Sequence, residues 1–222
     1  MRYPPGHRDE ARRRIVLEAG RLFRSKGYDG VGVDEIMRAA GLTHGGFYGH
    51  FRSKAALFRA VLADAHDFNL RMAARAATDD EGLRREAMAL VGYYLDPANR
   101  DRVGQGCMLA SLSGDAARAD ADARGAWAGQ VRDLATQFAR GLPPPAAGLA
   151  PDANRPDPRG MAAVALCVGG LTLARGMADE TLAAAMLAAC RAEVARVLAV
   201  ADPGAPSDAT SSRRSRRSSP AR

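Results

Sequence analysis

The sequence predicts an all-α protein with an N-terminal three-helix helix-turn-helix domain and a larger C-terminal helical domain. Residues 33–54 form the pattern of two short helices joined by a tight turn, and a third helix follows from Lys54. Beyond this stretch, apolar residues recur at helical spacing. Hydrophobic residues make up 47% of the 222 residues, which is ample for a core. Aromatic residues are only 5%, so we expect that core to be mostly aliphatic.

The first helix is expected over residues 9–26, after a loose arm of residues 1–7. One apolar stripe runs along it, formed by Ile15, Val16, Ala19, Leu22 and Phe23. Gly27 is its stop signal, because glycine readily takes the left-handed conformation that ends many helices. Residues 12–14 are three arginines, which we interpret as contacts to phosphate or solvent.

The second helix is expected to start at Val33, with acidic residues in its first turn where they favour the positive end of a helix. Gly41 is expected to end it, and Thr43 to cap the next segment, residues 44–50. Within that segment Phe47 faces inward and packs with Phe51 four residues later and with Leu42, while Tyr48 points to another face. Ser53 is a second N-cap, for the helix that follows.

The segment 44–50 carries more glycine than a structural helix needs, namely Gly45, Gly46 and Gly49. Each glycine in a helix interior costs roughly 1 kcal/mol relative to alanine. Bare backbone is useful where a DNA strand must approach closely. Donors surround this surface, from His44, Tyr48, His50 and Lys54. The alternative is a buried helical hairpin in an ordinary all-α domain.

Residues 8–60 resemble the N-terminal domain of the TetR/AcrR family of bacterial transcriptional regulators. The resemblance rests on many residues in fixed register: Phe23, Gly27, Ile36, Ala40, Gly41, Phe47, Tyr48, Phe51 and Lys54. It implies a ligand-responsive regulator, a repressor that a small molecule releases from a palindromic operator of double-stranded DNA. The residues expected at the DNA are Thr43, His44, Gly45, Gly46, Tyr48, His50 and Lys54.

Within that set, Thr43 and Lys54 are expected to hold phosphates, and the others to lie at the major groove. Two positions depart from the family pattern. Many relatives carry Thr or Ser at the position of Gly32, and Thr at the position of Gly46. One phosphate contact and one base contact are therefore missing from what the resemblance implies.

The rest of the chain is expected to be helical up to residue 200. The expected segments are a long helix at 54–77, a helix at 79–95, a short apolar segment at 103–112, a long helix at 116–141, a Pro-rich loop at 143–158, and two final helices at 160–177 and 179–200. The buried stripe of the first of these is expected to be Leu57, Val61, Ala65, Phe68 and Met72.

The two final helices are apolar around much of their circumference, which requires burial on several sides. We expect them to form a homodimer interface, in which two helices from each chain make a four-helix bundle. Gly169 and Gly170 would let the helices approach closely. The alternative is an internal hairpin of a monomer. The predicted domains are residues 1–57, a helix-turn-helix domain; 58–201, a ligand-binding and dimerisation domain; and 202–222, a disordered basic tail.

The net charge of +7 is concentrated at the two ends of the chain. Residues 1–60 hold twelve Lys and Arg against six Asp and Glu, and residues 203–222 hold five Arg against one Asp. Basic ends suit an anionic partner, although basic faces that are simply solvated are the alternative. The tail either strengthens DNA binding non-specifically or is only a soluble appendage.

No catalytic constellation stands out, so we expect no enzyme, no cofactor and no metal site. A cysteine hydrolase would need a histidine beside Cys107, but all four histidines lie at or before His66. Three cysteines at wide spacing give no disulfide framework and no zinc pattern. We expect Cys107 to be a buried, apolar residue. A redox- or electrophile-sensing thiol is the alternative.

An effector molecule, small and apolar or amphipathic, would enter the helical body. The candidate pocket residues are Met72, Tyr93, Tyr94, Cys107, Met108, Trp127 and Phe138, each of which also suits plain core. No apolar run is long enough to span a membrane, and the N-terminus has no apolar signal region. We therefore expect a cytoplasmic protein with no membrane partner. The competing function is a helical module that works through protein contacts without DNA.

Overall fold

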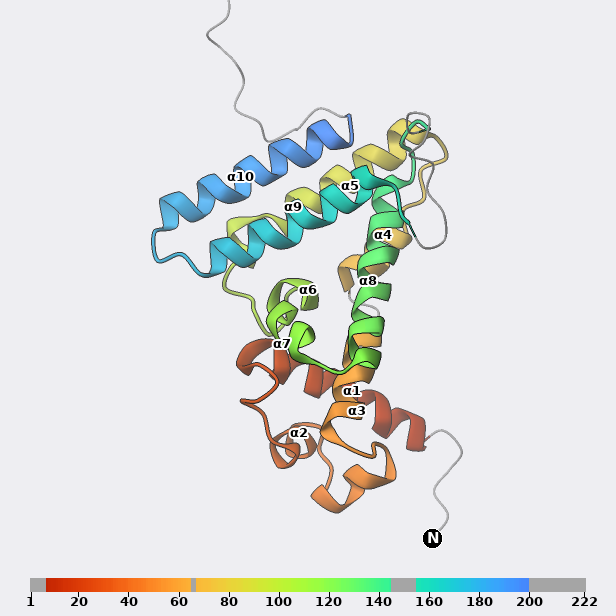
Figure 1. Cartoon of the computed structure of the whole chain (residues 1–222), viewed down its shortest axis with the longest axis vertical. Helices are drawn as coiled ribbons and strands as arrows, with labels where there is room; N and C mark the ends of the chain where they lie inside the picture. Colours follow the sequence, from red (N-terminus) through yellow and green to blue (C-terminus); the bar gives the residue numbers. More distant parts are fainter. Residues whose placement is uncertain (1–6, 65–66, 145–154, 200–222) are drawn as a thin grey trace, which may run out of the picture.

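The computed structural model describes residues 7–64, 67–144 and 155–199, and its elements are helices, which confirms the expected all-α fold class. Figure 1 labels most of them. In chain order they are α1 (His7–Lys26), α2 (Val33–Ala39), the 3₁₀ helix η1 (His44–Gly49), α3 (Lys54–Ala63), α4 (Asp67–Ala73), α5 (Asp80–Tyr94), the 3₁₀ helix η2 (Pro97–Asn99), α6 (Met108–Ser111), α7 (Ser113–Arg118), α8 (Ala121–Ala139), α9 (Pro158–Arg175) and α10 (Glu180–Val197).

The molecule is elongated, with α1, α2, η1 and α3 at one end and α5, α9 and α10 at the other (Figure 1). Helix α8 runs along the long axis between the two ends, and the short helices α6 and α7 lie beside it (Figure 1). Two hydrophobic clusters correspond to these ends. Trp127 on α8 packs against both clusters, so this helix is one physical connection between them.

The N-terminal cluster is built from side chains with almost no exposed surface, including Ile15, Phe23, Ile36, Phe47 and Leu57. The cluster continues along α3 to Leu62. The body contributes further members from α6 to α8, namely Met108, Leu112, Ala116 and Ala123. The N-terminal helices therefore share their core with the body. The boundary between residues 57 and 58 stays a prediction.

The expected single helix at 54–77 was wrong, because α3 ends at Ala63 and α4 begins at Asp67. Asp64 has an extended backbone, with φ −73° and ψ 131°. The apolar stripe survives the break, since Leu57, Val61, Phe68 and Met72 are all buried. The remaining member of the predicted stripe, Ala65, lies outside the described residues.

The expected helix at 116–141 was also wrong in its continuity. Ala119 is extended, with ψ 170°, and separates α7 from α8. Asp120 then caps α8, because its carboxylate accepts a hydrogen bond from the backbone N–H of Ala123 at 2.8 Å. The expected helices at 79–95, 160–177 and 179–200 correspond to α5, α9 and α10, with small shifts at their ends.

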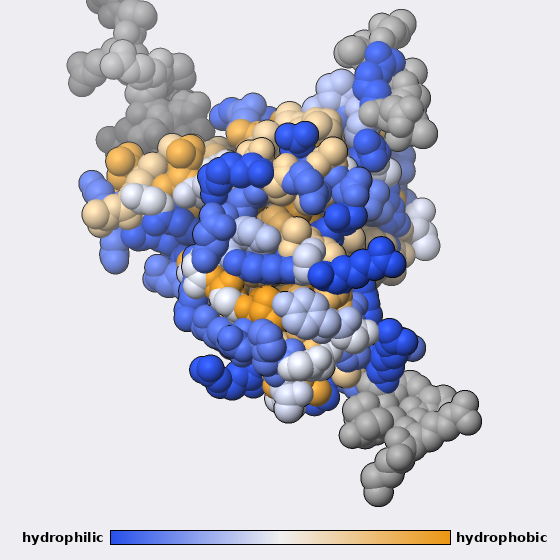
Figure 2. Space-filling view, turned by 60° about the horizontal axis from the view of Figure 1, so that its bottom comes forward, coloured by the Kyte–Doolittle hydropathy of each residue, from blue (hydrophilic) through white to orange (hydrophobic). Residues whose placement is uncertain are grey.

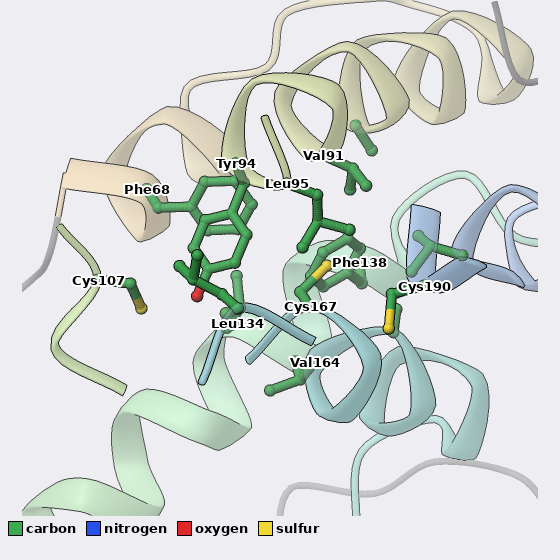
Figure 3. Packing of buried hydrophobic residues seen from close by; sticks show 14 of the residues in the cluster. Phe68, Val91, Tyr94, Leu95, Cys107, Leu134, Phe138, Val164, Cys167 and Cys190 are labelled. Carbon is green, nitrogen blue, oxygen red and sulfur yellow. The ribbon is translucent and has the colours of Figure 1, made fainter. Parts of the chain in front are cut away.

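Helices α9 and α10 pack against each other within one chain. A methyl group at Gly170 would lie 2.7 Å from Sγ of Cys190, so the close approach of the two helices requires glycine there. Gly169 has open space within 4 Å. Figure 3 shows the core beneath these helices, where the rings of Phe68 and Tyr94 pack with centroids 4.6 Å apart and planes tilted by 47°.

Several expectations concern residues outside those that the structure describes. These are residues 1–6 of the predicted arm, residues 145–154 of the predicted Pro-rich loop and the predicted disordered tail at 202–222. Helix α1 begins at His7, two residues before the predicted start. No helix in the described part of the chain is long and apolar enough to cross a membrane.

Candidate nucleic-acid interface

The segment η1 is anchored to the N-terminal core by its aromatic residues. Phe47 is fully buried and packs beside Phe51, with ring centroids 6.0 Å apart, as the four-residue spacing predicted. Tyr48, the next residue along, is 65% exposed. Its ring meets the edge of Phe47 at 5.3 Å and 86°. One buried aromatic therefore holds an exposed aromatic in a defined position on the surface.

His44, the first residue of η1, is held from two directions. Its Nδ1 is in close contact with Oδ1 of Asp34, in the first turn of α2. Its ring also lies edge-on to Tyr48, with centroids 6.2 Å apart and planes at 72°. The side chains of His44 and Asp34 are 52% and 71% exposed. The pair thus lies on the surface that η1 and α2 present to solvent.

The short helix expected over residues 44–50 is a 3₁₀ helix, η1. The N–H of Gly46 donates to the carbonyl oxygen of Thr43 at 3.0 Å, which is the three-residue spacing of a 3₁₀ helix. The expected side-chain cap from Thr43 was wrong, since its hydroxyl forms no cap hydrogen bond. The carbonyl takes the first bond of the tight turn instead.

The three glycines of η1 differ in the space around them. Added methyl groups at Gly45 and Gly49 would meet nothing within 4 Å, so the backbone there is open to a partner. A methyl group at Gly46 would lie 3.7 Å from Cε of Met37, which is buried in the N-terminal core. All three glycines are exposed, but only at Gly45 and Gly49 would a side chain point into open space, whereas at Gly46 it would contact Met37 and Thr43 of its own domain.

The far end of η1 is fixed by helix α1. Arg8 donates from Nη2 to the carbonyl oxygen of Gly49 at 2.8 Å. The guanidinium of Arg12 lies 4.5 Å from the ring centroid of Phe51. His50 is half-buried beside this end, and its Nδ1 has no hydrogen-bond partner among the described residues. Desolvation, and then the charges of Arg8 and Arg12, lower the pKa of His50.

Lys54 opens helix α3, which Ser53 caps by accepting from the N–H of Ala56 at 3.1 Å. The ammonium of Lys54 lies 4.3 Å from the ring centroid of Tyr28. This cation–π contact holds the charge at the surface of the domain. Lys26 pairs with Glu35 at 2.6 Å and thereby ties the end of α1 to the start of α2.

The structure brings His44, Tyr48 and Gly45 together on one exposed surface and places His50 at the α1 end of the same segment. Sequence reasoning missed Asp34 as a partner of His44 and Arg8 as a clamp on η1. The Asp34 contact joins residues ten apart across the turn, and the Arg8 contact spans 41 residues. Neither follows from local spacing. Figure 2 brings this end of the molecule forward and shows a mostly hydrophilic surface.

The candidate pocket residues of the body are divided among several places. Tyr93, Tyr94 and Cys107 line one cavity of about 60 Å³, together with Arg71 and Arg175. Burial raises the pKa of Tyr94 well above its ordinary value. The others lie elsewhere: Met72 and Phe138 in the body core, Met108 in the N-terminal cluster and Trp127 between the two.

Within the described residues, no group of three or more His, Cys, Asp or Glu side chains is arranged to hold a metal ion. Cys107, Cys167 and Cys190 are free and buried.

Several curated transcriptional regulators align with part of this chain. The activator FasR of Mycolicibacterium smegmatis is 37% identical over 101 residues, which cover 44% of each chain. The regulator SrpR of Pseudomonas putida is 36% identical over 89 residues, 40% of this chain and 39% of SrpR. The repressor Rv1474c of Mycobacterium tuberculosis is 40% identical over 81 residues, 36% of this chain and 42% of that protein. The chain thus spans less than half the length of these relatives.

Solved structures extend the likeness of fold to most of the chain. Escherichia coli NemR in its reduced form superposes with a TM-score of 0.64 at 20% identity, covering 88% of this chain and 99% of that chain. A putative TetR-family regulator from Mesorhizobium loti superposes with a TM-score of 0.58 at 22% identity, covering 87% and 97%.

The fold and the exposed η1 segment define the class: a two-part helical protein with a helix-turn-helix at one end. Residues 15–61 match the family described as bacterial regulatory proteins, tetR family. The N-terminal part of the chain therefore carries a helix-turn-helix domain of the TetR family, as the register of its residues predicted.

Proposed function

We propose that this protein is a DNA-binding repressor that a small molecule releases from a palindromic operator. The observation that supports this best is the exposed set of His44, Tyr48 and open glycine backbone on η1. Tyr48 is 65% exposed although it is held by a buried aromatic, which suits a contact to another molecule. Thr43 and Lys54 flank this surface and suit phosphate contacts.

A homodimer through α9 and α10 would supply the two-fold symmetry that a palindrome requires. The outer face of these helices is rich in alanine and carries Leu173 and Leu182, which are 55% and 53% exposed. Exposed leucines on a small-residue surface suit burial against a second copy. Gly169 lies on α9 with open space around it, which suits a close helix approach there.

Coupling between effector and DNA would pass through the body helices that contact the N-terminal domain. Arg59 of α3 pairs with Asp122 of α8 at 2.6 Å. Arg24 of α1 donates to the carbonyl oxygen of Gly104 at 2.9 Å. A molecule that enlarges the cavity at Tyr94 would shift these contacts, and DNA and effector would then oppose each other reciprocally. Because the effector would release the protein from DNA, we propose that the DNA-bound protein represses transcription.

The test is fluorescence anisotropy with a labelled fragment from upstream of the protein's own gene, at physiological salt and with excess unrelated DNA. Tyr48→Ala is compared with Leu70→Ala, which truncates a similarly exposed side chain on α4. We expect competitor-resistant binding that Tyr48→Ala abolishes and Leu70→Ala retains. Binding that the competitor removes equally from all three proteins would contradict operator recognition. Measuring transcription from the same DNA with and without the protein distinguishes repression from activation.

A further inference from the structure

A cavity in the body lies between α4, α5, α9 and the segment 99–107. Phe68 and Tyr94 are buried in its wall (Figure 3), whereas Arg71 and Tyr93 are exposed, so the cavity is open on their side. Its volume is about 60 Å³. Because one water needs roughly 10–15 Å³ of such space, the cavity has room for roughly four to six water-sized groups. It can therefore hold a small molecule.

The hydroxyl of Tyr94 is a buried polar group in the wall of this cavity. Tyr94 is 5% exposed, and its hydroxyl makes no hydrogen bond of normal geometry with the described residues. The thiol of Cys107 is its polar neighbour, but a thiol is a weak hydrogen-bonding group. A buried hydroxyl without a good partner costs free energy, and few native proteins retain one without a reason. Tyr94 is thus available to donate to a molecule in the cavity.

The same cavity is lined by a half-buried cation, Arg175. Its guanidinium donates to the carbonyl oxygen of Arg100 at 3.1 Å and to Oγ of Ser111 at 2.9 Å. These acceptors are neutral, and no carboxylate within the described part of the chain pairs with Arg175. Desolvation lowers the pKa of Arg175, which means that burial disfavours its charged form. An anion in the cavity would offset that cost.

The acidic side chain that lines the cavity is already paired. Asp67 accepts a hydrogen bond from Nε of Arg71 at 2.8 Å, and both side chains are more than half exposed. These two charges neutralise each other, so the cavity keeps the positive charge of Arg175. A positive charge, a hydroxyl donor and apolar walls together suit a carboxylate that carries a small apolar group.

We propose that this cavity binds a small carboxylate, whose oxygens accept hydrogen bonds from Arg175 and from the hydroxyl of Tyr94. Its carbon atoms would pack against Phe68 and Leu171, which also line the cavity. This inference rests on the proposed function, because it names the chemical class of the effector. The volume suits a short chain or a single ring. A neutral amide of the same shape would leave the charge of Arg175 without a counter-ion and should bind less tightly.

Occupation of the cavity would also act on a segment that reaches the DNA-binding end. Arg175 holds the carbonyl of Arg100 in the segment 99–107. Further along that segment, the carbonyl oxygen of Gly104 accepts from Nε of Arg24 on α1 at 2.9 Å. A carboxylate that draws the guanidinium of Arg175 toward itself would loosen this segment. The contact with α1 would then change, which gives the effector a route by which it opposes DNA binding.

Tyr94→Phe is the informative variant, because it removes the hydroxyl and keeps the ring that packs beside Phe68. In the free protein the removed group is unsatisfied, so the Tm should be equal to or above that of the wild type. Carboxylate binding should weaken roughly tenfold, as expected when a hydrogen bond to a charged group is lost. Arg175→Gln should weaken binding at least as much. Arg100→Gln is the matched control, since Arg100 also donates to a carbonyl, that of Met177, but does not line the cavity.

The experiment measures the binding of butyrate and benzoate to the full chain by ligand-observed NMR at neutral pH. Each acid is compared with its neutral amide, butyramide or benzamide. We expect an acid to bind in preference to its amide in the wild type and in Arg100→Gln, and the preference to disappear in Tyr94→Phe and Arg175→Gln. Equal binding of acid and amide, binding of neither acid, or a preference that Tyr94→Phe retains would overturn the inference. A clearly lower Tm of free Tyr94→Phe would overturn it as well, since the hydroxyl would then have a partner in the free protein.

Operator binding is measured separately, so that the inference and the proposed function fail in different ways. Fluorescence anisotropy with the operator fragment should show release of the wild type and of Arg100→Gln by the acid that binds, but no release of Tyr94→Phe. Acid binding without release would overturn the effector step of the proposed function and leave the carboxylate site supported. If the free protein binds no operator, the proposed function is overturned, while the preference for acid over amide still decides the inference.

Discussion

Gln130 on α8 donates from its side-chain amide to the carbonyl oxygen of Ala63, the last residue of α3, at 3.1 Å. The other end of the same amide accepts from Nδ2 of Asn69 on α4 at 2.9 Å. Gln130 therefore bridges the break between α3 and α4, where the N-terminal domain joins the body. Both residues are buried, since only 8% of the surface of Gln130 and 9% of the surface of Asn69 is exposed.

Replacing Gln130 by leucine should destabilise the protein by about 1–3 kcal/mol, because the carbonyl of Ala63 and the amide of Asn69 would lose a partner in a buried setting. Urea unfolding measures the change in the free energy of unfolding. Gln105→Leu is the control, because Gln105 is exposed and its replacement should change stability by no more than about 0.5 kcal/mol. Equal effects of the two substitutions would show that the bridge contributes nothing.

This bridge also explains why the sequence did not predict the break. The apolar stripe runs through both helices in one register, and Ala63 and Asp64 are neither glycine nor proline. The carbonyl left free where α3 ends is satisfied by a residue 67 positions later. The helix propensities of residues near Ala63 therefore could not predict the break. The helix ends at Gly27 and Gly41 were predictable, because glycine readily adopts a positive φ. The structure has φ values of 74° and 69° at these two residues.

The candidate site was also predictable only in part. Four-residue spacing placed Phe47 and Phe51 in the core and left Tyr48 on the surface. The contacts that orient η1 come from residues before it in the chain, Asp34 and Arg8 among them, and depend on how α1 and α2 pack. Sequence spacing thus predicted which residues face outward, but not which atom each of them presents.

Acid should destabilise the N-terminal domain through His50. Its pKa is lowered in the folded protein below the ordinary value of 6.5, by desolvation and by Arg8 and Arg12. The unfolded state therefore binds a proton more readily, and stability is lost as the pH falls below about 6.5 toward the folded pKa. Thermal unfolding between pH 5 and pH 8 should show this loss. His50→Gln should reduce it, and a pH profile unchanged by that substitution would contradict the assignment.

The buried thiols should react slowly in the native protein. Burial raises the pKa values of Cys107 and Cys167 above the ordinary value of 9.0, so little thiolate forms at neutral pH. Titration with a disulfide reagent at pH 8 should be slow in buffer and fast in urea. Rapid native modification that Cys107→Ala removes would instead support a sensing thiol.

The same thiols make stability depend on alkaline pH. Their folded pKa values lie above that of the unfolded chain, so the unfolded state releases protons first as the pH rises past about 9. The stabilising contribution is complete below that pH and declines above it. Urea unfolding at pH 8 and pH 10 should show a lower free energy of unfolding at the higher pH. Cys167→Ala, compared with the wild type, should reduce this difference.

If the protein dimerises through α9 and α10, a charge at Leu182 on α10 should disrupt the dimer. Leu182→Glu would place a charge on the outer face of the α9 and α10 pair, where a second chain would have to desolvate it. The variant should sediment as a monomer at concentrations where the wild type is a dimer. Leu70→Glu is the control, because Leu70 on α4 is similarly exposed, at 55% against 53%, but lies outside α9 and α10. Loss of the dimer in Leu182→Glu alone should also weaken operator binding, since two linked half-sites bind more tightly than one. A dimer that survives Leu182→Glu, or dissociates equally in both variants, would place the interface elsewhere.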